Sequence, residues 1–133
     1  MEKVKTIAVN VAAAALISLI LIWGHTLYRQ HVQFGKGEKA LAARDFPAAV
    51  AGYEAAIHMY TPGSSVVEKS AQKLWEIAES TERNGDVTRA LITYRALRSS
   101  FYAVAWLSTP GSDWIKRCDA RIAALVPLQQ QGR

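Results

Sequence analysis

The sequence RDFPAAVAGY at residues 44–53 returns in altered form as NGDVTRALITY at residues 84–94. In each copy a turn with an aspartate precedes an apolar residue, an alanine follows three positions later, and a tyrosine lies four positions beyond the alanine. These residues are Ala49 and Tyr53 in the first copy and Ala90 and Tyr94 in the second. Small and aromatic residues at intervals of three and four after a turn indicate a repeated helix that packs closely against a neighbour.

Outward from these copies, breaking residues divide the chain from Phe34 onward into helices. Asp45-Phe46-Pro47 fits a helix start with proline at the first helical position, and Asn84-Gly85-Asp86 is a turn that ends with a capping aspartate. The tetrapeptide Thr-Pro-Gly-Ser occurs twice, and we expect its serines, Ser64 and Ser112, to cap the helices that follow. The expected helices span residues 34–44, 47–60, 64–83, 86–100 and 112–126. The first either starts separately or continues a helix that begins nearer the N-terminus. The stretch 101–108 either extends the fourth helix or forms a separate turn.

Residues 7–23 form an apolar run, IAVNVAAAALISLILIW, and no charged residue occurs from Thr6 to Gly24. Extended to Thr26, the run has about 20 residues, the length that a helix needs to cross about 30 Å of hydrocarbon. A cleaved signal peptide is the alternative interpretation. Because no small-x-small cleavage motif follows the run, we expect an uncleaved anchor.

The expected organisation is an N-terminal transmembrane anchor over residues 1–28, a helical domain over residues 29–128 and a flexible polar tail over residues 129–133. The two lysines ahead of the apolar run favour a cytoplasmic N-terminus, whereas the four basic residues that follow it up to Arg44 favour the opposite orientation. A short tail before a signal-like run usually stays inside. We therefore expect a single-pass protein of a bacterial inner membrane, with its helical domain in the periplasm.

One face of the apolar run carries small or hydrogen-bonding residues at intervals of four, namely Asn10, Ala14 and Ser18. Inside a membrane, such residues let a second helix approach closely and hydrogen bond to the first. The alternative is that Asn10 lies near the lipid headgroups and that the alanines merely fill the helix surface. The sequence leaves both interpretations open.

The two copies and their surroundings resemble the tetratricopeptide repeat, in which small residues let paired helices touch and an aromatic residue fills the groove beside them. The first repeat would run from about residue 34 to residue 62, and the second from about residue 73 to residue 101. The resemblance implies an all-α fold, a short antiparallel solenoid of about two repeats capped by the helix at 112–126, and a role in scaffolding. The matching packing positions are Gly37, Ala40, Ala49, Tyr53, Ala56, Ala78, Ala90 and Tyr94.

The chain also departs from the tetratricopeptide pattern. Ala49 and Ala90 lie 41 positions apart, whereas the usual period is about 34 residues. Leu97 stands where a small residue is usual, so we expect a wider helix contact there. Two repeats are few for a solenoid. The membrane helix, a partner or a second copy of the chain would then cover the apolar surface that so short a solenoid leaves exposed.

Four aromatic residues crowd the region before the last expected helix: Phe101, Tyr102, Trp106 and Trp114. Large rigid side chains with a polar tip are favoured at protein contacts, so they form a candidate partner surface. The alternative is that they bury the last helix against Tyr94 and Leu97, as a small domain needs aromatic residues for its own core. For this reason we favour the second interpretation.

The sequence has no motif for catalysis, phosphate binding or a metal cluster, so we expect neither an enzyme nor a bound cofactor. Cys118 is the one cysteine and we expect it to be buried in a helix. The formal net charge is +5, with both signs interspersed, unlike the basic stripe of a nucleic-acid-binding protein.

These features predict a non-enzymatic interaction module that binds the lipid bilayer and other membrane proteins, as an accessory or assembly subunit of a membrane complex. A second hypothesis is a structural subunit that forms homo-oligomers, in which a neighbouring copy completes the solenoid. A third is a cofactor or pigment carrier that uses His25 at the end of the span.

Overall fold

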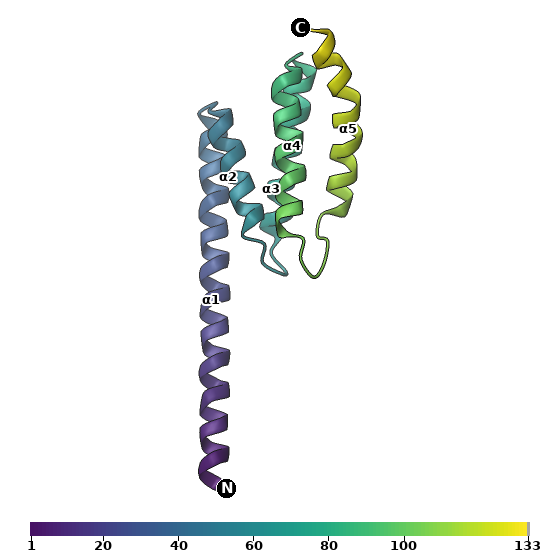
Figure 1. Cartoon of the computed structure of the whole chain (residues 1–133). Coiled ribbons are helices and arrows are strands. Elements are labelled where there is room, and N and C mark those ends of the chain that lie inside the picture. Colours follow the sequence, from purple (N-terminus) through teal and green to yellow (C-terminus); the bar gives the residue numbers. More distant parts are fainter. Residues whose placement is uncertain (133) are drawn as a thin grey trace.

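A computed structural model describes residues 1–132, and within this range the regular elements are five α-helices (Figure 1). They are α1 (Glu2–Ala42), α2 (Phe46–His58), α3 (Ser65–Arg83), α4 (Val87–Val104) and α5 (Ser112–Gln131). The expected all-α fold class is thus confirmed. The C-terminal part of α1 packs beside α2, followed by α3, α4 and α5, and the N-terminal part of α1 projects beyond this domain (Figure 1).

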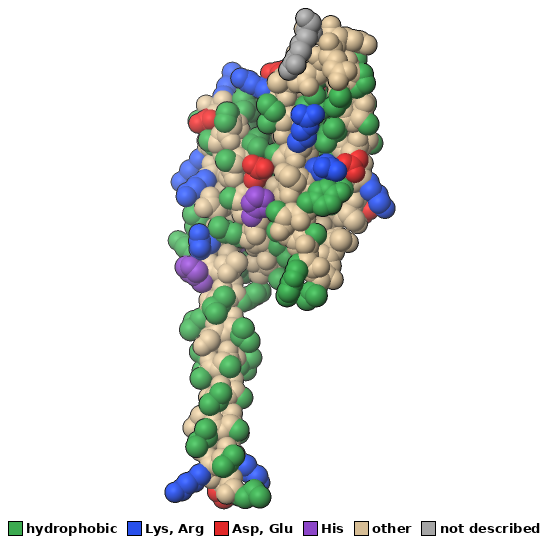
Figure 2. Space-filling view, in the orientation of Figure 1, with side chains coloured by type: hydrophobic (Ala, Val, Ile, Leu, Met, Phe, Trp, Pro, Cys, Tyr) green, Lys and Arg blue, Asp and Glu red, His purple; other side chains and the backbone are tan. Residues whose placement is uncertain are grey.

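The first helix is long enough and apolar enough to cross a membrane, and none of its most apolar 18-residue window is buried inside the protein. Its 41 residues correspond to about 60 Å at a rise of 1.5 Å per residue. The helix expected at residues 34–44 is therefore the end of α1 and not a separate element. Figure 2 shows the projecting part covered by apolar side chains, with charged ones at its N-terminal tip.

The α1/α2 and α3/α4 pairs are joined by turns of the same design. The N–H of Asp45 donates to the carbonyl of Ala40 at 2.9 Å, and the N–H of Asp86 donates to the carbonyl of Thr81 at 2.9 Å. The carboxylate of each aspartate then accepts the backbone N–H three residues further on, which caps the next helix. The cap by Asp86 that the sequence predicts is confirmed. At the other turn, α2 begins one residue before Pro47, and Asp45 is its cap.

Each copy also places its tyrosine in the same kind of contact. Tyr53 and Tyr94 are fully buried, and their rings meet Phe34 and Trp75 edge-on, with centroids 5.6 Å and 5.0 Å apart. Each hydroxyl donates to a glutamate of the preceding helix. The two helix pairs are therefore internal structural repeats, offset by 41 positions, as Phe34/Trp75, Gly37/Ala78, Ala49/Ala90 and Tyr53/Tyr94 show.

The two Thr-Pro-Gly-Ser turns differ in how the next helix begins. Ser64 caps α3, because its hydroxyl accepts the N–H of Val66 at 3.2 Å. Ser112 instead lies inside α5, and Gly111 in a left-handed conformation occupies the cap position without a side-chain hydrogen bond. The expected cap by Ser112 is therefore wrong. Gly111 lies against the ring of Phe101, where a larger residue has no room.

Two helices extend past their expected ends. α4 continues to Val104, so residues 101–104 extend the fourth helix and do not form a separate turn. α5 continues past Pro127 to Gln131. The three glutamines at its end are good helix formers, which favours this extension. Residues 129–131, which we assigned to a flexible tail, are therefore helical.

Candidate functional site

An apolar hollow of about 380 Å³ opens between α2, α3 and α4. Its wall comes from the first turn of α2, the last turns of α3 and the N-terminal half of α4. Ile92 stands in this wall with 57% of its surface exposed. Its lining includes Phe46, Val50, Ile77, Arg89 and Ile92.

A second hollow of about 710 Å³ continues from the first, since Val50 and Ile92 line both. This part is more polar and is bordered by Glu54, Arg95 and an ion pair between Arg98 of α4 and Asp119 of α5. We call the two hollows together the α2–α4 groove. The groove has an apolar end near the start of α2 and a charged end toward α5 (Figure 2 shows apolar and charged side chains mixed on this domain).

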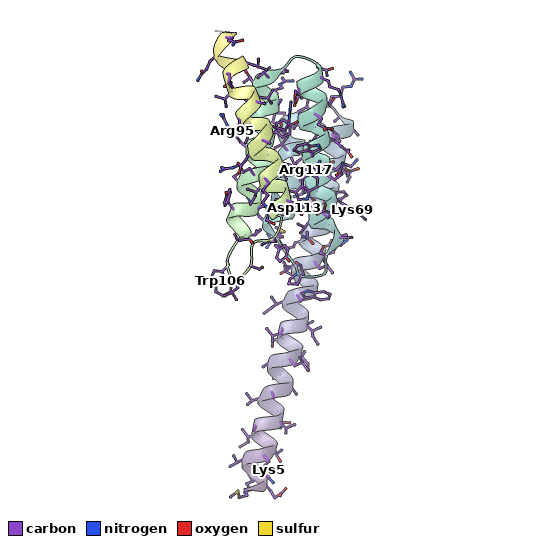
Figure 3. All side chains as sticks on the ribbon, turned by 90° about the vertical axis from the view of Figure 1, so that its right-hand side faces the viewer. Lys5, Lys69, Arg95, Trp106, Asp113 and Arg117 are labelled. Atoms are coloured by element: carbon purple, nitrogen blue, oxygen red, sulfur yellow. The ribbon has the colours of Figure 1, made fainter. Side chains whose placement is uncertain are left out.

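Three arginines and two acidic residues border the α2–α4 groove, namely Arg89, Arg95, Arg98, Glu54 and Asp119. Arg89 forms an ion pair with Asp86 at 3.5 Å and lies over the ring of Phe46, 6.0 Å from its centroid. Arg95 projects from α4 at the other end of the groove (Figure 3). Burial raises the pKa of the Glu54 carboxyl above its ordinary value. The groove thus combines an apolar end with a border that carries both basic and acidic side chains.

The three residues of the predicted span interface lie in the exposed part of α1. Asn10, Ala14 and Ser18 are four residues apart, so they share one helix face. The hydroxyl of Ser18 donates to the carbonyl of Ala14 at 2.8 Å. The amide of Asn10 is exposed on the same face and can donate to a second helix.

The four aromatic residues do not form one surface. Phe101 and Trp114 are buried in the core, whereas Tyr102 and Trp106 are exposed. Trp114 joins α5 to α3: its indole N–H donates to the carboxylate of Glu68 at 3.1 Å, and its ring lies 6.0 Å from that of Trp75. Half of the predicted surface is thus used inside the domain, as the alternative interpretation proposed.

Comparisons with known protein families, with characterised proteins and with solved structures find no match for this chain.

A buried polar residue that the sequence analysis missed connects α1 to the rest of the domain. The side chain of Gln30 is fully buried, its amide N–H donates to the carbonyl of Ala56 at 3.0 Å, and its oxygen accepts the hydroxyl of Ser64 at 2.6 Å. It thus fixes the position of α1 against the end of α2 and the start of α3. The signal that could have found it is helical spacing, since Gln30 lies four residues before Phe34 and seven before Gly37, both on the packed face.

His25 and Cys118, the candidates for ligand binding and for nucleophilic chemistry, lie on different helices, α1 and α5. His25 is exposed on α1 near the end of the apolar run, and residues 1–132 contain no group of three or more His, Cys, Asp or Glu side chains that could hold a metal ion. Cys118 is fully buried in α5, as expected. Burial, together with the charge of Asp119, raises the pKa of this thiol to about 12. A protonated, buried thiol is a poor nucleophile.

High pH should destabilise the helical domain. Burial raises the pKa of Tyr94 to about 12 and that of Cys118 to about 12, from ordinary values of 10.0 and 9.0. The folded state therefore holds these protons more tightly, so the stabilisation is complete below about pH 9 and is lost as the pH rises toward 12. Urea unfolding of the full chain in detergent, at about pH 8 and about pH 11, should show the loss. The Cys118→Ala variant should lose less, and an equal loss in both proteins would contradict the role of the thiol.

Proposed function

We propose that this chain is a non-enzymatic, membrane-anchored interaction module, and that it acts as an accessory or assembly subunit of a membrane protein complex. The observation that carries the proposal is the α2–α4 groove. Its apolar end leaves Ile92 more than half exposed beside a hollow of about 380 Å³. A concave apolar patch with a polar border on a small domain is typical of a protein contact site.

The occupant that the groove fits is an amphipathic helix or extended segment of another membrane protein. Its apolar side chains would fill the space beside Phe46, Val50 and Ile92, and acidic side chains would face Arg89 and Arg95. Filling the hollow removes apolar surface from water and so provides the driving force. The arginines fix the direction of the segment.

The internal repeats support a tetratricopeptide-like interpretation of the fold, with α1/α2 and α3/α4 as two repeats and α5 as the cap. Both pairs have an aspartate-capped turn, a small residue at the helix contact and a buried tyrosine. Helix-pair repeats of this kind stack into surfaces that bind other chains. A scaffolding role follows from the same interpretation.

The exposed apolar part of α1 supports anchorage as a single span in a bacterial inner membrane. We propose a cytoplasmic N-terminus and a periplasmic helical domain, which follows from the short tail with Lys3 and Lys5 ahead of the run. Within the bilayer, the face of Asn10, Ala14 and Ser18 would pair with a helix of the same partner complex. Span and groove would then hold one complex at two points.

Purification of the tagged full-length chain in mild detergent, followed by mass spectrometry, tests this function. A constant set of other membrane proteins should accompany the wild-type chain. Ile92→Glu should lower their recovery severalfold, because it places a charge in the apolar end of the groove. Leu128→Glu is the matched control, since Leu128 is 51% exposed on α5 and lies outside the groove. It should leave recovery unchanged.

Two results would overturn the proposal. Equal recovery of partners by the wild type and the Ile92→Glu variant would remove the groove as the contact site. A wild-type chain that is purified alone, as a homo-oligomer of defined mass, would replace it with the self-assembly hypothesis. A visible absorption band in the purified complex that is lost in a His25→Ala variant would instead favour the cofactor carrier.

A further inference from the structure

One end of the helical domain faces the apolar part of α1. The α2–α3 loop, residues 59–64, and the α4–α5 loop, residues 105–111, both lie at this end, on the side toward which the N-terminal half of α1 extends (Figure 1). If α1 crosses a bilayer, these two loops are the parts of the domain beside the span that come nearest to the lipid.

The two loops at this end lack charged residues. Residues 59–67 and 99–112 contain no Asp, Glu, Lys or Arg, although these types make up 20% of the chain. A loop end that faces water usually carries polar and charged side chains. The absence of charge over both stretches removes the main cost of bringing them against lipid.

The tip of the α4–α5 loop presents two large apolar side chains. Trp106 is 88% exposed and Leu107 is 85% exposed. The N–H of Trp106 donates to the carbonyl of Ser108 at 3.2 Å, which folds the tip into a tight turn. Figure 3 shows Trp106 at the bottom of the domain, projecting toward the N-terminal end of α1. Tryptophan is the residue that most favours the membrane–water interface, and the adjacent leucine adds apolar surface.

The position of the domain along α1 brings this tip within reach of the bilayer. Gln30 bonds to Ala56 and Ser64, so it marks where α1 meets the base of the α2–α3 loop. The apolar run ends at Trp23, and the six residues between, 24–29, correspond to about 9 Å of helix. The polar interfacial layer on each side of a bilayer is about 5–8 Å thick. Because α1 is unbroken here, no hinge moves the domain away from the surface.

We propose that the α4–α5 loop is a second membrane contact, in which Trp106 and Leu107 insert into the interface of the bilayer that α1 crosses. The inference rests on the proposed membrane anchorage and adds an orientation to it. The helical domain contacts the lipid surface through its α2–α3 and α4–α5 loops. The α2–α4 groove therefore opens parallel to the membrane, toward neighbouring membrane proteins. The uncharged α2–α3 loop lies against the headgroups next to it.

Quenching of tryptophan fluorescence by brominated phosphatidylcholine tests this contact in the reconstituted full chain. The domain has two buried tryptophans, Trp75 and Trp114, which give a constant background. A Trp23→Phe variant leaves Trp106 as the exposed reporter, and a Trp106→Phe variant leaves Trp23. The bromine should quench both single variants and quench the double variant least. Ile92→Trp, added to the double variant, places a reporter on an exposed site away from the loops and should add no quenching.

The two reporters separate the failure of the loop contact from the failure of the anchor. Quenching of Trp23 without quenching of Trp106 would overturn the second contact and leave the span intact. Absence of quenching at both positions would overturn the anchorage and, with it, the loop contact. Quenching of the Ile92→Trp reporter as strong as that of Trp106 would also contradict the inference, because the domain would then lie on the membrane in another orientation.

Discussion

Gly52→Ala should destabilise the helical domain, even though alanine is the better helix former. A Cβ atom at Gly52 would lie 2.6 Å from the backbone N and 2.7 Å from the Cα of Gly37 on α1. Backbone atoms cannot turn away as a side chain does, so α1 and α2 would have to separate. The loss through overpacking, about 1–3 kcal/mol, should exceed the gain in helix propensity of about 1 kcal/mol. The urea midpoint of the full chain, followed by the fluorescence of Trp75 and Trp114, should fall.

Gly35→Ala is the matched control for this prediction. Gly35 lies in α1 two residues before Gly37, and a Cβ atom there would meet nothing within 4 Å. This change should raise stability slightly, through helix propensity alone. A stable Gly52→Ala protein with an unchanged midpoint would show that the helices are not in backbone contact.

Gly111→Ala should have the other large effect. Gly111 has a φ of 71°, and a Cβ atom there would lie 2.2 Å from the ring of Phe101, which is buried. The left-handed conformation costs a non-glycine residue about 1–2 kcal/mol, and the overlap with a buried ring adds about 1–3 kcal/mol. The domain should therefore unfold at a much lower urea concentration than the wild type. Circular dichroism and tryptophan fluorescence would show whether α5 separates first.

The repeated tetrapeptide supplies the control for Gly111. Gly63 occupies the same place in the other Thr-Pro-Gly-Ser turn and has a φ of 82°, but a Cβ atom there would meet nothing within 4 Å. Gly63→Ala should therefore show only the conformational cost. Equal losses in the two variants would mean that the contact with Phe101 contributes nothing.

The local features of the fold could be predicted from the sequence, because they depend on neighbours in the chain. Asp45 and Asp86 cap helices through backbone groups three residues away. The long apolar run predicts the projecting helix, and the spacing of Ala49 and Tyr53 predicts the buried face of α2. These signals need no knowledge of what packs opposite.

Features that depend on distant residues could not be predicted in the same way. Gln30 is buried because Ala56 and Ser64, which are far along the chain, satisfy its amide. Gly111 holds the cap position of α5 in place of Ser112, and it lies against the buried ring of Phe101, a contact that the local sequence does not reveal. Both cases follow from tertiary contacts that override a local preference.

The candidate site was the least visible part of the molecule in the sequence. The α2–α4 groove is formed by residues of three helices, and no motif marks it. The aromatic residues before α5 did stand out, but only the structure separates the buried Phe101 and Trp114 from the exposed Trp106. Exposure decides which of them can bind a partner or lipid.

Anchorage and sidedness are tested most directly by one experiment on the full chain with a C-terminal tag, expressed in a bacterial host. Membranes are extracted with alkaline carbonate, and intact spheroplasts are treated with protease. We expect the protein to stay in the membrane fraction, because the apolar run of α1, about 20 residues, is long enough to cross the hydrocarbon. We also expect the tag to be removed from intact spheroplasts. Release of the whole chain by carbonate would contradict the membrane anchor, and a tag that is cut only after lysis would reverse the proposed orientation.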